Sequence, residues 1–167
     1  MGYTIAICDD DKTMADKLTA SLKNEFMKAG RNDVIIDYYD TGVQLLETLK
    51  NKMYKAVLLD INMEPMDGFS VAEAIGKSGY RTKIIFVTSH EDVVYDTFDY
   101  TPFYFIRKSR YETYVQRVVK KLIAIDGYEK TIVLDDKDGI ININSGDITY
   151  VPVSYTHLRA HETLRHL

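Results

Sequence analysis

Short apolar runs alternate with amphipathic segments over the first 125 or so residues of the chain. The apolar runs are continuous rather than alternating, which is typical of parallel strands buried on both faces. They lie at Tyr3–Cys8, Val34–Tyr39, Ala56–Leu59, Lys83–Thr88 and Phe103–Ile106. Strands that alternate with helices predict an α/β fold, a doubly wound five-stranded parallel sheet with right-handed crossovers.

The segments between these runs carry apolar residues at helical spacing. The first helix is marked by Met14, Leu18, Leu22 and Phe26. Asp11 or Thr13 would cap its start, and Gly30 suits its end. Further helices are marked by Val43, Leu46 and Leu49, by Val71, Ala74 and Ile75, and by Val115, Val118, Val119 and Leu122 after a start near Ser109. A shorter helical segment fits between Asp92 and Tyr100.

The pattern changes near Tyr128, where three short β-prone runs follow, separated by two turn-forming clusters. Such runs predict antiparallel hairpins. About 25 residues are too few for a core of their own. We therefore expect one domain over residues 1–125, a linker and the first strands of an incomplete all-β-type domain over 126–152, and a tail over 153–167.

The tail holds three of the four histidines, His157, His161 and His166. It could form a short surface helix, on which His157 and His161 would share a face as metal ligands, but no third ligand is in view. The run Ser154–Thr163 instead resembles translated sequencing-adapter DNA, and we interpret it so.

Composition places the chain among soluble globular proteins, with 46% hydrophobic and 28% charged residues. A net charge of −4 argues against coating of nucleic acid by bulk charge. No apolar run is long enough to span a membrane. The single cysteine, Cys8, cannot form an internal disulfide, which favours a reducing, cytoplasmic location. We expect this buried thiol to have a raised pKa and to be inert.

Polar residues gather where the predicted strands end. The first strand runs into Asp9 and Asp10, the third into Asp60, the fourth ends in Thr88, and the fifth is followed by Lys108. Ligands of open parallel sheets bind at this carboxyl edge.

The chemistry of this set points to a divalent cation. Two carboxylates about 4 Å apart repel by roughly 4 kcal/mol at an effective dielectric near 20. Mg²⁺ prefers oxygen ligands and would remove this repulsion. An ionised carboxylate beside such an ion needs no general base to accept a phosphoryl group.

These residues also carry a family resemblance. The motifs Asp9-Asp10, Asp60–Met63, Met66–Gly68, Thr88-Ser89 and Phe105–Lys108 resemble those of the receiver (CheY-like) domain of bacterial response regulators, over residues 3 to about 125. The resemblance implies a phosphoprotein of a two-component system, phosphorylated by a sensor histidine kinase with Mg²⁺ as cofactor. It implies no enzyme beyond gain and loss of its own phosphoryl group, and a possible homodimer on phosphorylation.

The resemblance also implies roles for single residues. Asp60 would be the phosphoacceptor. Asp10 and Asp60 would bind the metal directly with the backbone carbonyl of Asn62, and Asp9 would act largely through water. Lys108 and Thr88 would contact the phosphoryl group, and Phe105 would be the switch aromatic that moves inward. We further expect Asn62 and His90 to modulate the lifetime of the phosphoaspartate.

Three positions depart from the family pattern. Glu64 precedes Pro65, where the family has proline directly after the methionine. Ser109 stands where the family has a proline that follows a cis bond, and cis geometry before serine would cost about 3 kcal/mol. Phe105 lacks the hydroxyl of the more usual tyrosine. These changes affect switching rather than the acceptor.

The segment Val133–Val151 resembles the first strands of a LytTR-type DNA-binding domain, which implies a LytTR (AgrA-like) regulator of transcription. The full-length protein would bind promoter DNA, and residues 1–167 would not. One alternative is a stand-alone receiver that signals by protein contact. A haloacid-dehalogenase-like phosphatase is another, but it needs an aspartate at Asn62. A flavodoxin-like nucleotide binder is disfavoured, since the first strand ends in aspartates rather than glycines. Tyr38 and Tyr39 we expect to be packing residues.

Overall fold

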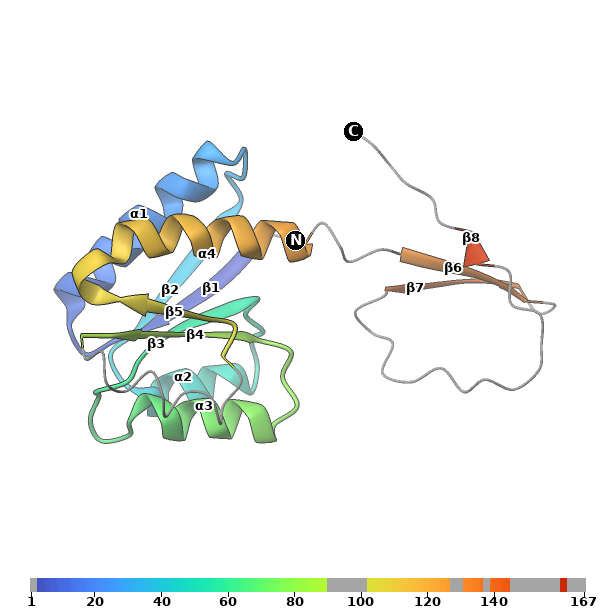
Figure 1. The fold of residues 1–167 in the computed structure, drawn as a ribbon. Helices are drawn as coiled ribbons and strands as arrows, with labels where there is room; N and C mark the ends of the chain where they lie inside the picture. The colour runs from blue at the N-terminus through green and yellow to red at the C-terminus, as the bar shows by residue number, and fades with distance from the viewer. Residues whose placement is uncertain (1–2, 90–101, 127–130, 137–138, 145–159, 162–167) are drawn as a thin grey trace. The chain divides into compact units, whose positions relative to one another are not determined.

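The structure, a computed structural model, describes residues 3–89, 102–126, 131–136, 139–144 and 160–161. Five parallel strands form one sheet in the order β2-β1-β3-β4-β5 (Figure 1). They are β1 (Tyr3–Cys8), β2 (Val34–Tyr39), β3 (Ala56–Asp60), β4 (Lys83–Thr88) and β5 (Tyr104–Arg107). The predicted fold class is confirmed. The strand order reverses at β1 and β3, so a crevice for ligands is expected at their carboxyl ends.

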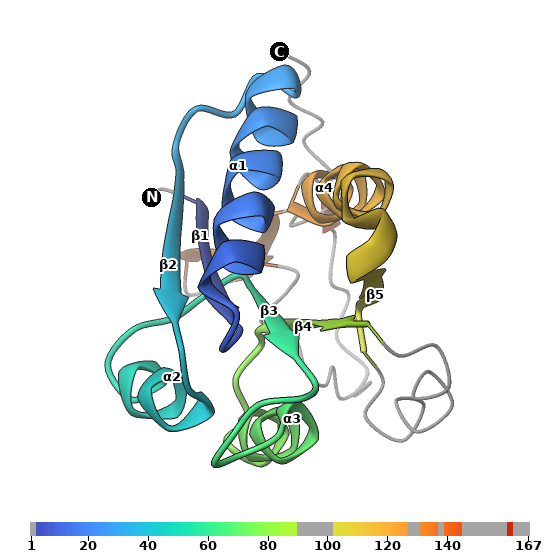
Figure 2. The ribbon, with the colours of Figure 1, turned by 90° about the vertical axis from the view of Figure 1, so that its left-hand side faces the viewer.

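Helices cover both faces of this sheet. They are α1 (Lys12–Lys28), α2 (Gly42–Leu49), α3 (Gly68–Lys77) and α4 (Tyr111–Asp126). Seen along the sheet, α1 and α4 lie on one face, and α2 and α3 lie on the other (Figure 2). A short 3₁₀ turn, η3 (Lys108–Arg110), joins β5 directly to α4. The lysine at its start therefore stays at the carboxyl edge of the sheet.

The apolar stripes of the helices form the core. In α1, the predicted face is buried, and Leu18, Leu22 and Phe26 are fully covered. Asp11 is its N-cap, accepting from the backbone N–H groups of Thr13 and Met14. The residues expected to mark α4 are all buried as well: Val115, Val118, Val119 and Leu122.

Helix α2 is rotated relative to the predicted face. Val43 is 51% exposed, whereas Gly42, Leu45 and Leu49 are buried. A Cβ at Gly42 would overlap the side chain of Val71 on α3. The contact face of α2 therefore passes through a glycine, which a search for apolar side chains overlooks.

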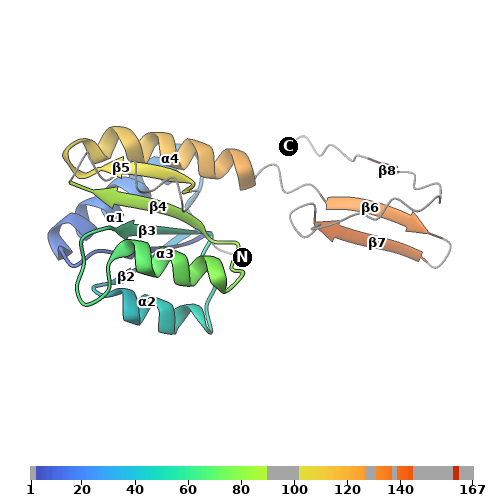
Figure 3. The ribbon, with the colours of Figure 1, turned by 60° about the horizontal axis from the view of Figure 1, so that its bottom comes forward.

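Residues 120–167 form a second compact unit, while residues 1–119 form the first. In the second unit, β6 (Thr131–Asp136) pairs antiparallel with β7 (Gly139–Asn144), which is one of the expected hairpins (Figure 3). On its other side, β6 pairs with β8 (Ala160–His161), so His161 is in a strand. The third β-prone run and His157 fall outside the described residues, as does the segment Asp92–Tyr100.

None of the helices described in the structure combines the length and apolarity that crossing a membrane requires.

Candidate functional site

Three aspartates meet at the carboxyl edge of the sheet. Asp9 and Asp10 follow β1, and Asp60 ends β3. One carboxylate oxygen from each lies within 4.8 Å of the others. Asp9 and Asp60 are buried, whereas Asp10 is exposed. The expected convergence of these side chains from separate strands is therefore present.

The ammonium of Lys108 lies between the two buried carboxylates. Its Nζ is 2.9 Å from Oδ2 of Asp9 and 3.1 Å from Oδ2 of Asp60, and it donates a hydrogen bond to Oδ1 of Asp9. Burial acts to lower the pKa of Lys108, but its bonds to the two carboxylates outweigh burial and raise it. Lys108 is therefore a firmly charged group that links β5 to β1 and β3.

Burial disfavours negative charge on both inner aspartates. It raises the pKa of Asp60 to about 6, with a further contribution from the charge of Asp9, against the opposing attraction of Lys108. Burial also raises the pKa of Asp9, although Lys108 and the backbone N–H of Asp11 favour its charged form. One ammonium thus does not compensate this group of carboxylates.

The donor set fits a hard divalent cation. Oδ2 of Asp9 is buried and accepts no hydrogen bond, even though the Lys108 ammonium is close to it. Because that ammonium is shared with Asp60, the oxygen still lacks a hydrogen bond of its own, and a second cation would stabilise it. All three side chains offer carboxylate oxygens, the ligand type that Mg²⁺ prefers.

A close backbone approach fixes the position of Asp60. Gly68, at the start of α3, donates its N–H to the carbonyl of Ile61 at 2.9 Å. A Cβ at Gly68 would overlap the carbonyl oxygen of Asp60. Asp67 caps α3 by accepting from the N–H of Ser70. The loop after β3 thus returns tightly onto the strand end that carries Asp60.

The remaining candidate residues lie around this cluster. Thr88 ends β4 and is buried. Phe105 pairs in register with Phe86 and packs, partly buried, against the core beneath α2 and α3. Asn62 is exposed in the loop after β3. His90 lies outside the described residues.

Two of the departures from the family pattern have a described geometry. Pro65 follows a cis peptide bond after Glu64, whereas the bond between Lys108 and Ser109 is trans. Lys108 reaches both carboxylates with this trans bond. Cys8 is buried, and burial raises the pKa of its thiol to about 12, in the expected direction.

Two residues at this edge were not among the sequence candidates. Asp40 follows β2 directly; burial raises the pKa values of Cys8 and Tyr38, and the charge of Asp40 raises them further. Its position after a strand was a usable signal. The hydroxyl of Tyr38 donates to the backbone carbonyl of Asp9 at 3.1 Å. No sequence signal distinguishes this tyrosine from its neighbour Tyr39.

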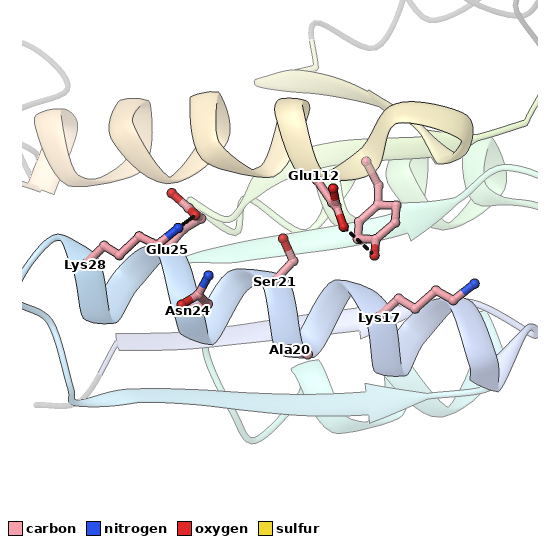
Figure 4. A pocket seen from close by; sticks show the side chains of 8 residues that line it. Lys17, Ala20, Ser21, Asn24, Glu25, Lys28 and Glu112 are labelled. Carbon is pink, nitrogen blue, oxygen red and sulfur yellow. Dashed lines mark hydrogen bonds and ion pairs between the residues drawn. The ribbon is translucent and has the colours of Figure 1, made fainter.

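A separate groove of about 520 Å³ lies between α1 and the start of α4. Figure 4 shows its lining of mixed charge, with Lys17, Glu25 and Lys28 on α1 and Glu112 on α4. Lys28 is ion-paired with Glu25 at 2.7 Å. The groove offers hydrogen-bonding groups but none of the clustered carboxylates of the strand edge.

The fold, the aspartate cluster and its lysine together define a receiver domain. Residues 5–120 match the family of response regulator receiver domains, and the chain belongs to this family. Among curated proteins it is similar to the transcriptional regulatory protein YpdB of Escherichia coli (strain K12), with 25% identity over 137 residues, 78% of this chain and 56% of YpdB. The chain spans about half the length of this relative.

Solved structures give the same picture. The response regulatory domain of protein MrkE from Klebsiella pneumoniae is 22% identical with a TM-score of 0.65, over 73% of this chain and 96% of that one. The response regulator protein TrrA from Thermotoga maritima, solved in complex with Mg²⁺–BeF, is 28% identical with a TM-score of 0.60, over 73% of this chain and 99% of that one.

Proposed function

We propose that this chain is the phosphoacceptor receiver of a two-component system, with Asp60 as the residue that accepts the phosphoryl group. The observation that carries the proposal is the site itself. A buried carboxylate at the end of β3 lies 3.1 Å from a lysine ammonium and beside two further carboxylates. TrrA, a similar protein solved in complex with Mg²⁺–BeF, supports a receiver that takes Mg²⁺.

The transfer starts from a phosphohistidine of a sensor kinase. An oxygen of Asp60 bonds to phosphorus while the bond from phosphorus to the histidine nitrogen breaks, and that nitrogen keeps the electron pair. With a pKa of about 6, Asp60 is mostly ionised at neutral pH and needs no general base. Lys108 is placed to contact the oxygens of the incoming phosphoryl group.

Asp9, Asp10 and Asp60 would hold Mg²⁺, with the backbone carbonyl of Asn62 as a further ligand. The ion supplies neutralisation of the charge that develops on the phosphoryl oxygens. Asp9 and Asp60 are fixed by burial and by Lys108, so these side chains are positioned before the ion arrives.

The response to phosphorylation would pass through Thr88 and Phe105. Thr88 is buried at the end of β4, the strand beside Asp60. Phe105 lies on the next strand and is partly buried, so an inward movement would bury it further. This movement would change the surface around β4 and β5 and favour a homodimer. Asn62 and His90 would control access of water to the phosphoaspartate.

For the output, we propose transcription control through a LytTR-type DNA-binding domain that begins with β6 and β7. The alignment with YpdB, a transcriptional regulatory protein, is longer than the matched range 5–120. Residues 126–152 would be the linker and the start of this domain. We expect residues 1–167 alone not to bind specific DNA, and tight, salt-resistant, sequence-selective binding in a gel shift would contradict this.

A phosphatase of the haloacid-dehalogenase type is the competing function. It would need an acid–base carboxylate at position 62, where this chain has an exposed asparagine. We therefore expect no sustained hydrolysis of an aryl phosphate.

The test is incubation with acetyl phosphate and Mg²⁺, followed by intact-mass measurement. The unmodified chain should gain the mass of one phosphoryl group, and Asp60→Asn should gain none. Asp33→Asn, which changes an exposed aspartate just before β2, is the matched control and should react normally. A chain that gains no mass, or an Asp60→Asn variant that gains as much as the control, refutes the proposal.

A further inference from the structure

The backbone of the loop that carries Asp9 and Asp10 has an unusual hydrogen-bond partner. At the end of β1, the N–H of Asp9 still donates to the carbonyl of Tyr39 on β2. In a parallel ladder, the carbonyl of Asp9 would next accept from Thr41. However, β2 and its ladder with β1 end at Tyr39. The hydroxyl of Tyr38 donates to this carbonyl instead, at 3.1 Å.

Tyr38 is itself held in place. The ammonium of Lys12, in the first turn of α1, lies 4.5 Å from the centre of the Tyr38 ring. Lys12 is also ion-paired with Asp16 one turn further along the helix. A cation over an aromatic face restrains the ring as well as the lysine. The tyrosine therefore bridges β2, the acidic loop and α1.

This bridge matters most for Asp10. Asp10 is exposed, and no hydrogen bond to its carboxylate is found among the described residues. Its position therefore depends on the backbone on either side of it. The preceding peptide carbonyl is held by Tyr38, and the following N–H, that of Asp11, donates to Oδ1 of Asp9. Without the hydroxyl, only one of these two restraints remains.

We propose that Tyr38 is a positioning residue for the metal site, whose hydroxyl fixes the peptide between Asp9 and Asp10 and so orients both carboxylates toward Mg²⁺. The inference rests on the proposed function, because it assumes that these aspartates bind the ion. A loop that is held in its binding geometry before the ion arrives binds more tightly than one that must be ordered on binding.

The variant that tests this is Tyr38→Phe, which keeps the ring under Lys12 and removes only the hydroxyl. Mg²⁺ binding is measured by titration calorimetry on the whole chain, and thermal unfolding is followed in EDTA. We expect the dissociation constant for Mg²⁺ to rise about two- to tenfold, the change that one hydrogen bond of ordinary net strength corresponds to.

Tyr39→Phe is the matched control. It removes a hydroxyl from the adjacent residue of the same strand, on the opposite face of the sheet. That hydroxyl is 2.5 Å from the hydroxyl of Tyr54, which donates to Asp37. These hydrogen bonds do not include the loop that carries Asp9 and Asp10. We expect Tyr39→Phe to lower the unfolding temperature in EDTA while its Mg²⁺ affinity stays that of the unmodified chain.

The possible outcomes separate the two proposals. If Tyr38→Phe and the unmodified chain bind Mg²⁺ equally well, the role of Tyr38 is refuted and the proposed function stands. If both tyrosine variants weaken Mg²⁺ binding to the same extent, the effect is one of general stability, and the role of Tyr38 is again refuted. An unmodified chain that binds no Mg²⁺ overturns both proposals together.

Discussion

We expect the Asp60→Asn variant to be more stable than the unmodified chain at pH 8 when divalent metal is removed. Asp60 is 3% exposed, and the charge of Asp9 lies beside it. Asparagine has nearly the same shape and no charge, and its amide oxygen can still accept from Lys108. The substitution therefore removes a buried charge while it leaves the packing almost unchanged.

The size of the gain follows from the pKa of Asp60, which is raised from 3.8 to about 6 in the folded protein. In this range the folded state keeps a proton that the unfolded state has lost, so stability falls as the pH rises from about 4 to about 6. The loss approaches about 3 kcal/mol at pH 8 and about half of that at pH 5. Asp60→Asn does not undergo this loss, so its advantage should be larger at pH 8 than at pH 5.

Urea unfolding followed by circular dichroism measures this difference, because the chain has no tryptophan to report by fluorescence. Both proteins are unfolded in EDTA at pH 5 and at pH 8, and then at pH 8 with saturating Mg²⁺. The ion would bind strongly only to the folded unmodified chain, so it should shrink or reverse the advantage of the variant.

Asp33→Asn is the control for charge removal in general. Its hydrogen bond from Arg31 lowers the pKa of Asp33, so removing this exposed charge should slightly destabilise the protein at pH 8. Two results would refute the reasoning on Asp60: an Asp60→Asn variant less stable than the unmodified chain at pH 8 in EDTA, or an advantage that is equal at both pH values.

Three further substitutions test other parts of the structure. Lys108→Gln leaves two buried carboxylates without their cation and should lower the free energy of unfolding in EDTA by about 3–5 kcal/mol. In the same urea titration, Mg²⁺ should raise the stability of this variant by more than it raises that of the unmodified chain. Gly68→Ala should lower the free energy of unfolding by about 1–3 kcal/mol and slow phosphorylation by acetyl phosphate, because its Cβ would overlap the backbone of Asp60. Gly76→Ala is the control: a Cβ there meets open space, so its stability should be unchanged or higher. Leu22→Ala should cost about 2–5 kcal/mol in urea unfolding without changing the Mg²⁺ affinity, since this side chain is fully buried in α1.

Most of the sheet could be predicted from the sequence because a strand that is buried on both faces must be apolar throughout. The run Tyr3–Cys8 coincides with β1, whose side chains are nearly all buried. The run Val34–Tyr39 coincides with β2 as well, although β2 is an edge strand whose side chains are only partly covered. Helix α2 shows where the pattern fails. Its buried face includes Gly42, which packs against Val71 by having no side chain. The spacing of apolar side chains cannot reveal a contact made by a glycine. The sequence pattern therefore placed Val43 on the buried face of α2, although it is exposed.

For the candidate site, the sequence could predict which residues come together but not the distances between their side chains. The topology of a parallel sheet brings the residues after β1, β3, β4 and β5 to one edge, so Asp9, Asp60, Thr88 and Lys108 could be grouped from the sequence alone. That Lys108 lies within 3.1 Å of two carboxylates depends on the turn η3, which the sequence does not specify. The hydrogen bond from the Tyr38 hydroxyl to the Asp9 carbonyl depends on where β2 ends. The pattern of apolar and polar residues does not predict it either.

The electrostatics of the site explain why one lysine has to be shared. Among the described residues, the Lys108 ammonium contacts two of the three carboxylates, so the cluster keeps an excess of negative charge that Mg²⁺ would neutralise. Phosphorylation would then add negative charge at Asp60, and Lys108 is the described cation already in contact with that residue. Lys108 would shift from Asp9 toward the phosphoryl group, while Asp9 would help to hold the ion. A lysine that bridges both aspartates before the reaction therefore stabilises the resting site and is already in place for the phosphorylated one.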